Sequence, residues 1–181
     1  MLRVTRYHPV LVALHWILAF LIIAALTLGA VKLAHMPNSD PHKVEGLRAH
    51  MMGGMLILAL IVLRLFVRNV TVHPPKATTG STFLDLVARI SHRALYIAMI
   101  AMPIMGLMLA FQAGLFGVVF DEHGVLPPDL WVYWPRWAHY IISRILIFLI
   151  GLHVCGALYH TFVLRDGLLR RMFFGRRKDI E

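Results

Sequence analysis

Four long apolar runs constrain this chain more than any other feature of its sequence. A helix needs about 20 apolar residues to cross a hydrocarbon core about 30 Å thick. Runs of that length cover residues 9–31, 47–67, 91–111 and 138–164. Because lipid offers no partner for backbone polar groups, each run is expected to form a membrane-spanning helix. The sequence therefore predicts an all-α integral membrane protein, a four-helix bundle in a single domain covering residues 1–181.

The composition agrees with a membrane protein and argues against other classes. Hydrophobic residues make up 59% of the chain, and the cations behind its net charge of +9 flank the apolar runs. We therefore expect membrane lipid, and no nucleic acid, as a partner. The single cysteine, Cys155, excludes an internal disulfide, a four-cysteine iron–sulfur cluster and a CxxCH motif for covalent haem.

Lys and Arg residues are distributed unevenly between the two ends of the predicted helices. The N-terminal segment, the connection between the second and third runs and the C-terminal tail carry thirteen of them, and the opposite side carries four (Lys32, Lys43, Arg48 and Arg136). The positive-inside rule therefore places both termini in the cytoplasm. The charged N-terminal segment has features of a signal peptide, but so long an apolar run with a histidine inside it fits an uncleaved first span better.

The last apolar run contains several histidines, although polar groups inside a membrane are costly. His139 and His153 lie 14 residues apart, so both imidazoles share roughly one helix face, about 21 Å apart along the axis. One metal ion cannot bridge that distance, so we expect two sites at two depths. A single intramembrane histidine often only hydrogen-bonds across helices, but a depth-matched set of four is harder to explain in that way.

Each of these histidines has a depth-matched partner on another predicted helix. His50 lies about one turn from the outer end of the second run, and His15 about two turns from the inner end of the first. The expected pairs are His50 with His139 at the outer level and His15 with His153 at the inner level. Two facing imidazoles in a helix bundle can hold haem iron, so we expect two b haems, bound without covalent attachment.

Two further histidines lie near the cytoplasmic end. His160 is seven residues beyond His153, about 20° off the same face and about 10 Å deeper, and His92 begins the third run. Each is a candidate for an alternative inner ligand, for a proton-accepting group in a quinone pocket, or for an interfacial residue without a further role.

Several arginines also have two interpretations. Arg144 lies inside the last run, where it either snorkels toward the surface or pairs with a haem propionate. Arginines that flank the second and third runs on the cytoplasmic side mostly fit topology and lipid headgroups. A second interpretation is that one of them neutralises haem propionates: Arg64, Arg68, Arg89 or Arg93.

Several motifs resemble those of the bacterial cytochrome b561 family. They are "LHW" in the first run, "RAHMMGG" opening the second, "SHRALYI" opening the third and "GLHVCGALYH" in the last. Members of this family are small four-helix dihaem proteins of the bacterial inner membrane. The resemblance implies the same location for this multi-pass chain. It also implies haem ligation by the set that depth pairing indicates: His15, His50, His139 and His153.

The resemblance implies an activity as well. Family members exchange electrons with ubiquinone, so we expect an oxidoreductase that takes electrons from superoxide or another periplasmic one-electron donor and passes them to ubiquinone. No side chain is predicted to act as a covalent catalyst. The alternative is a cytochrome b relay or anchor subunit of a larger dehydrogenase or hydrogenase, although the short loops favour a stand-alone enzyme. The oligomeric state stays open, with a homodimer as one alternative.

Overall fold

The computed structural model describes residues 3–176, 179 and 180, so residues 1–2, 177–178 and 181 of the predicted domain lie outside the described residues. Within the described residues, four helical segments are long and apolar enough to cross a membrane. These segments are Pro9–Leu33, Lys43–Val70, Thr82–Gln112 and Trp134–Leu164. The prediction of an all-α membrane protein with four spanning helices is confirmed.

The first and last spans each end in a π-helical segment. α1 (Pro9–Thr27) continues as η1 (Leu28–Leu33), and α5 (Trp134–Tyr159) continues as η2 (His160–Leu164). The middle spans are α2 (Lys43–Val70) and α3 (Thr82–Gln112). The shorter elements are α4 (Leu115–Val119), the 3₁₀ helix η3 (Leu168–Met172) and the strands β1 (Arg3–Val4) and β2 (Asp179–Ile180). Insertions of π-helix often lie at functional sites, which draws attention to both ends of the bundle.

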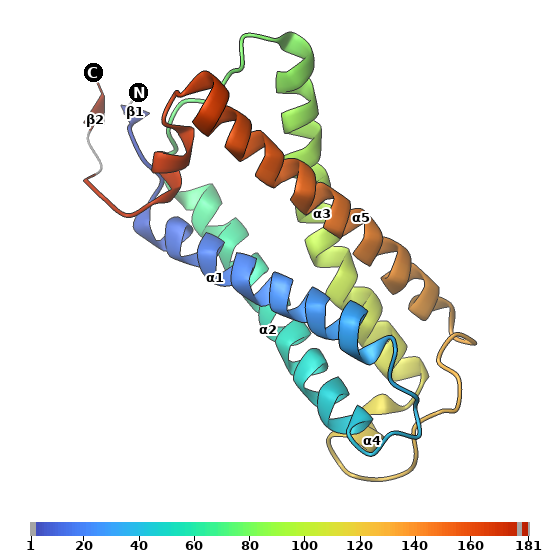
Figure 1. Ribbon diagram of the computed structural model, residues 1–181. Helices are drawn as coiled ribbons and strands as arrows, with labels where there is room; N and C mark the ends of the chain where they lie inside the picture. The colour runs from blue at the N-terminus through green and yellow to red at the C-terminus, as the bar shows by residue number, and fades with distance from the viewer. Residues whose placement is uncertain (1–2, 177–178, 181) are drawn as a thin grey trace.

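The helices form two antiparallel pairs. α1 lies along α2, and α3 lies along α5, with both chain ends and the α2–α3 connection at one end of the bundle (Figure 1). At that end β1 pairs antiparallel with β2, Arg3 opposite Ile180. The short α4 lies at the opposite end (Figure 1). The two termini therefore lie on one side of the bundle, and its assignment to the cytoplasm stays a prediction from the distribution of cations.

Two features of α3 differ from what hydropathy alone indicates. The helix begins at Thr82, not near Ser91, because the Ser81 side chain accepts a hydrogen bond from the Leu84 amide at 3.5 Å and caps a polar first turn. It also continues without interruption through Pro103. Neighbouring helices can compensate for the backbone hydrogen bond that a proline removes inside a membrane.

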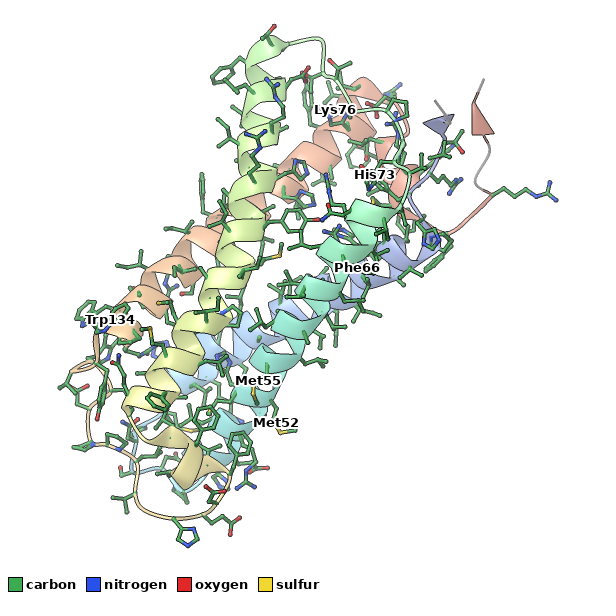
Figure 2. All side chains as sticks on the ribbon, turned by 180° about the vertical axis from the view of Figure 1, so that it is seen from behind. Met52, Met55, Phe66, His73, Lys76 and Trp134 are labelled. Carbon is green, nitrogen blue, oxygen red and sulfur yellow. The ribbon has the colours of Figure 1, made fainter. Side chains whose placement is uncertain are left out.

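The bundle core draws on all four spans. Ile22 of α1, Ile61 of α2, Leu95 of α3 and Leu146 of α5 belong to one buried cluster. Lipid tails are as apolar as these side chains, so close packing, not escape from water, holds the helices together. The outward faces are apolar too, as the exposed Met52, Met55 and Phe66 along α2 show (Figure 2).

Segments distant in the sequence are joined at the end that carries both termini. The Arg6 guanidinium donates to the Arg170 carbonyl at 3.0 Å and to the Phe173 carbonyl at 3.2 Å. The Trp16 indole donates to the Met172 carbonyl at 2.7 Å, and Arg171 donates to the Pro75 carbonyl at 2.8 Å. The segment around η3 is therefore fixed across the N-terminal end of α1.

The opposite end is organised around a buried lysine. Lys43, only 5% exposed, donates from Nζ to the carbonyl of Leu33 at 2.5 Å and to that of Met36 at 2.6 Å. These carbonyls end or follow η1, where helix geometry leaves acceptors without an internal donor. The first turn of α2 thereby holds η1 in place, close to the predicted outer histidines.

Candidate functional site

The structure brings together both histidine pairs that depth indicates. His50 of α2 faces His139 of α5, with ring centres 6.1 Å apart and ring planes at 76°. His15 of α1 faces His153 of α5, with ring centres again 6.1 Å apart and planes at 67°. One helix, α5, therefore contributes one imidazole to each pair, and the partners come from two other helices.

The spacing of the rings fits coordination to a shared metal. A metal–imidazole nitrogen bond is about 2 Å long, so two imidazoles on opposite sides of one ion place their ring centres roughly 6 Å apart. Both pairs match that value. Among the described residues, no group of three or more His, Cys, Asp or Glu side chains is arranged around a metal position. Each pair therefore suits a cofactor that brings its remaining metal ligands with it, as haem does.

Two glycines make room for the outer pair. A Cβ atom at Gly29 of η1 would lie 3.0 Å from Cε1 of His50, and one at Gly106 of α3 would lie 3.3 Å from Cε1 of His139. Gly53 is only three residues after His50, yet a Cβ atom there meets nothing within 4 Å. Gly29 and Gly106 lie on other helices than the histidines they contact, so they could not be found by searching the sequence close to those histidines.

The ring nitrogens of the outer pair are suited to ligation. Nδ1 of His139 donates to the Met102 carbonyl at 3.0 Å, which leaves Nε2 to bind a metal. This is the usual arrangement of a metal-bound histidine, because the second hydrogen bond fixes both tautomer and ring orientation. The His50 ring lies near the backbone of Ala25, but its Nδ1 has no hydrogen bond of normal geometry within the described residues.

Two adjoining cavities flank the outer pair, and they differ in character. One is lined by apolar residues of α1 and η1 and, on α5, by the polar side chains of Arg136, Tyr140, Ser143 and Arg144, together with the two histidines. The other is lined by Ile22, Ile57, Leu146 and Pro103 with the same histidines. Haem has an apolar macrocycle and one edge with two carboxylates, so apolar cavities of which one also contains two arginines are a suitable environment.

Among the outer cations, only some are free to interact with a ligand. The Lys43 ammonium is buried against two carbonyls, and Arg48 donates to the Val119 carbonyl at 2.7 Å while pairing with Glu122 at 3.4 Å. Arg136 instead stacks over the Trp131 ring at 4.4 Å, and Arg144 over the Tyr140 ring at 4.9 Å. Stacking uses the face of a guanidinium and leaves its N–H edge for an anion.

At the inner level a third imidazole joins the predicted pair. The His92 ring lies 5.3 Å from that of His153, at 85°, and the side chain is exposed. Its Nδ1 lies 2.7 Å from the Ala88 carbonyl, so Nδ1 carries the proton and Nε2 is available. His92 therefore lies at the edge of the inner pair, where it can reach a molecule outside the bundle.

His160 is separated from the inner pair and has a different partner. It is buried, and its Nδ1 donates to the carboxylate of Asp166 at 2.6 Å. Burial raises the pKa of Asp166, but hydrogen bonds from His160 and the Leu168 amide outweigh that effect, so the net shift of this pKa is downward. The two histidines that sequence reasoning treated alike thus have unlike surroundings.

Arg64 of α2 lies beside the inner histidines. Its guanidinium acts electrostatically on both His15 and His153, and Nη1 donates to the hydroxyl of Tyr96 on α3. The guanidinium of Arg68 lies over the same tyrosine ring, 5.7 Å from its centre. Of the four cytoplasmic-side arginines considered from sequence, Arg64 is the one that the structure directs at the inner pair.

These features define a class: a membrane-spanning helix bundle whose paired imidazoles suit a flat metal cofactor. Comparison with known families identifies the chain more closely. It belongs to the prokaryotic cytochrome b561 family, because the sequence model of that family matches residues 6–175. The protein is therefore a multi-pass bacterial membrane oxidoreductase of electron transfer that binds haem b.

Curated relatives resemble the chain over almost its full length. "Probable superoxide oxidase CybB" of Yersinia pestis is 27% identical, covering 95% of this chain and 98% of its own. Cytochrome b562 of Cereibacter sphaeroides is 28% identical, covering 92% and 94%. "Cytochrome b561 homolog 2" of Escherichia coli K12 is also 28% identical, covering 92% and 90%. The predicted family resemblance is confirmed.

Proposed function

We propose that the chain binds two b haems, one between His50 and His139 and the other between His15 and His153. The observation that carries this proposal is the equal 6.1 Å spacing of the two ring pairs, at opposite ends of α5. A bound b haem accepts and passes on one electron at a time. Histidines would hold each iron from both sides, so substrates would exchange electrons with these sites without binding to iron.

The proposed reaction moves electrons from superoxide to ubiquinone. Two superoxide anions each lose one electron, ubiquinone takes up both electrons with two protons, and the products are two O₂ and one ubiquinol. Support comes from the Y. pestis relative, which carries the name "Probable superoxide oxidase CybB" and aligns with 95% of this chain. Two sites about 21 Å apart along one helix also suit a donor and an acceptor at different depths.

On the donor side, Arg136 has the best position to attract an anion. It lines the cavity beside His50 and His139, and its stacking on Trp131 holds the charge at the outer end of α5. Fixed positive charge near a binding site raises the local concentration of anions and their rate of association. Lys43 and Arg48 are bound to backbone carbonyls, so they contribute to this field from fixed positions.

On the acceptor side, His92 is the better placed of the two quinone-site candidates. It is exposed and lies 5.3 Å from the ring of His153, so a quinone headgroup beside it lies close to the inner site. His160 is bound to Asp166, and this carboxylate–histidine pair suits delivery of protons from the cytoplasm. With the orientation that the positive-inside rule predicts, this end of the bundle would lie on the cytoplasmic side of a bacterial inner membrane.

The proposal is tested first by haem content. A pyridine haemochrome assay of the purified protein should give two haems per chain. His50→Ala and His139→Ala should each remove the outer haem, and His15→Ala and His153→Ala the inner one, with one haem remaining in every case. His35→Ala, an exposed histidine in the outer connection, is the matched control and should keep both haems. One haem in the unaltered protein would refute the two-site proposal.

The reaction is tested separately from ligation. The oxidised holoprotein is mixed with superoxide and a soluble ubiquinone, and haem absorbance is followed together with ubiquinol formation. We expect rapid reduction of both haems and formation of ubiquinol. Variants that keep only one haem should form little ubiquinol, because the proposed reaction uses both sites. Two haems without superoxide-dependent reduction would favour the alternative of a relay subunit that receives electrons from a larger dehydrogenase.

A further inference from the structure

Among the described residues, Arg64 is a partly buried cation without an anionic partner. It lies on α2 near the end that carries both termini, and its Nε is buried with no hydrogen-bond partner within the described residues. In that part of the chain the ion pairs are Arg48–Glu122 and His160–Asp166, so no carboxylate neutralises Arg64. A buried charge is costly unless it is paired, and an unsatisfied N–H adds to that cost.

The surroundings of Arg64 fix the direction of its guanidinium. Nη1 donates to the Tyr96 hydroxyl, and the guanidinium carbon lies 5.4 Å from the centre of the Tyr96 ring. Tyr96 lies one turn after His92 on α3. The guanidinium is thereby held at the inner level, where it acts electrostatically on His15 and His153.

From this arrangement we infer that Arg64 binds a propionate of the haem proposed between His15 and His153. The inference rests on that proposed haem site. Haem b carries two carboxylates on one edge, and an arginine fork binds a carboxylate through two parallel N–H donors. Nε is one of the donors that such a fork uses, and it is the atom left unsatisfied. Tyr96 acts as a positioning residue that holds the fork in place.

The inferred contact has a consequence for the reduction potential of the inner haem. Reduction adds an electron, so a nearby positive charge stabilises the reduced form, and an uncompensated propionate destabilises it. Removal of Arg64 takes away the cation and exposes the charge of the propionate. Both changes lower the potential of the inner haem and leave that of the outer haem unchanged.

The test is a potentiometric titration of the holoprotein, with neither superoxide nor quinone present. In Arg64→Gln we expect one of the two haem transitions to move to lower potential by about tenfold in the equilibrium constant, about 59 mV for a one-electron couple. That transition should be the one missing from His153→Ala. Resonance Raman spectra should show a shifted propionate-bending band, the signature of a lost hydrogen bond to a propionate.

Matched variants separate this contact from a general effect of charge. Arg89→Gln removes an exposed arginine from the same end of the bundle and should leave both potentials unchanged. Tyr96→Phe keeps the ring but removes the acceptor of the Arg64 hydrogen bond, so it should cause a smaller downward shift. If Arg64→Gln loses the inner haem entirely, Arg64→Lys should retain it with a lowered potential.

Two results would overturn the inference. The first is an inner potential that does not change in Arg64→Gln, or that changes equally in Arg89→Gln. The second is a lowered potential with an unshifted propionate band, which would mean that Arg64 acts through its charge alone. Failure of the proposed function itself would look different, because it would show in the haem content of the His15 and His153 variants or in the absence of ubiquinol formation.

Discussion

Gly29 allows the backbone of η1 to lie directly against the His50 ring, because glycine has no side chain. A Cβ atom there would lie 3.0 Å from the His50 ring, closer than nearly all real contacts of this kind. The π-helical segment η1 brings this glycine against α2, and Lys43 anchors the end of that segment. The backbone of η1 therefore packs closely against the imidazole of His50 and limits where that ring can lie.

This close approach leads to a prediction for Gly29→Ala. The added methyl group should push the His50 ring aside and weaken binding of the outer haem, with a several-fold loss of that haem during purification. Gly151→Ala is the control, because Gly151 is exposed and a Cβ atom there meets nothing within 4 Å. Haem content is measured by absorbance. Equal haem occupancy in the two variants would contradict the prediction, because it would mean that η1 shifts to accommodate the added methyl group.

Asp166 gives a prediction about pH. Burial opposes ionisation, but the hydrogen bonds from His160 and the Leu168 amide hold the folded-state pKa of Asp166 below its ordinary value. A carboxyl group with a lowered pKa adds stability that is fully present above its unfolded pKa and is lost as the pH falls through the folded value. The effect is modest because the carboxylate is partly exposed to solvent, which screens its charge.

The expected result concerns thermal unfolding of Asp166→Asn in detergent. The variant should unfold at a lower temperature than the unaltered protein near pH 6, and the difference should shrink as the pH falls below about 4. Asp121→Asn, an exposed carboxylate of the outer connection, should show no such pattern. A difference in unfolding temperature that persists at the lowest pH would show that the Asp166 charge is not its source.

At the scale of elements, the crossing of the helices sets the angle between paired rings. α5 supplies one imidazole to each pair, whereas α1 and α2 supply the partners, and the ring planes meet at 67° and 76°. Axial imidazoles at nearly right angles make the two iron orbitals that interact with them almost equal in energy. Parallel imidazoles would separate those orbitals.

The prediction is a spectroscopic one. If both haems keep these ring angles, electron paramagnetic resonance of the oxidised protein should show strongly anisotropic low-spin signals for both. The single-haem variants His139→Ala and His153→Ala should each retain one such signal. A rhombic signal in either variant would mean that haem binding turns the rings of the remaining pair toward parallel.

The π-helical segments show how one element type serves both ends of the bundle. η1 presents Gly29 to His50, and η2 carries His160 into its contact with Asp166. A π-helical turn widens the spacing of backbone hydrogen bonds and rotates the residues that follow. Each segment therefore changes which side chains face the bundle interior just where the proposed sites lie.

At the scale of the whole molecule, substitutions at opposite ends of the bundle should affect different steps, namely haem reduction by superoxide and formation of ubiquinol. Arg136→Gln removes a cation beside the outer pair and should slow haem reduction by superoxide several-fold, more strongly at low than at high ionic strength. His92→Ala alters the edge of the inner pair and should slow ubiquinol formation while haem reduction stays close to normal.

Stopped-flow absorbance with superoxide, with and without a soluble ubiquinone, measures the two steps in one preparation. Arg93→Gln is a control for His92→Ala, because Arg93 is its exposed neighbour on α3. Normal ubiquinol formation in His92→Ala would move the quinone site elsewhere, with His160 as the next candidate. Slow haem reduction in that variant would contradict the separation of the two faces.

The four spanning helices and the depth of each histidine could be predicted from the amino-acid sequence alone. Both follow from regular geometry: an apolar run of sufficient length must be helical in lipid, and a rise of about 1.5 Å per residue converts position into depth. The pairing of His50 with His139 and of His15 with His153 needed nothing more than matched depth, and the structure brings those rings together.

The rotation of each helix against its neighbours could not be predicted in this way, because it depends on how the helices pack in three dimensions. That rotation brings Gly29 and Gly106 against the outer histidines, places His92 beside His153, and directs Arg64 toward the inner pair. It also binds the Lys43 ammonium to two carbonyls, so a cation that the sequence shows only as one of four on the outer side has a structural role. Helix periodicity defines faces within one helix, but packing between helices determines which faces meet.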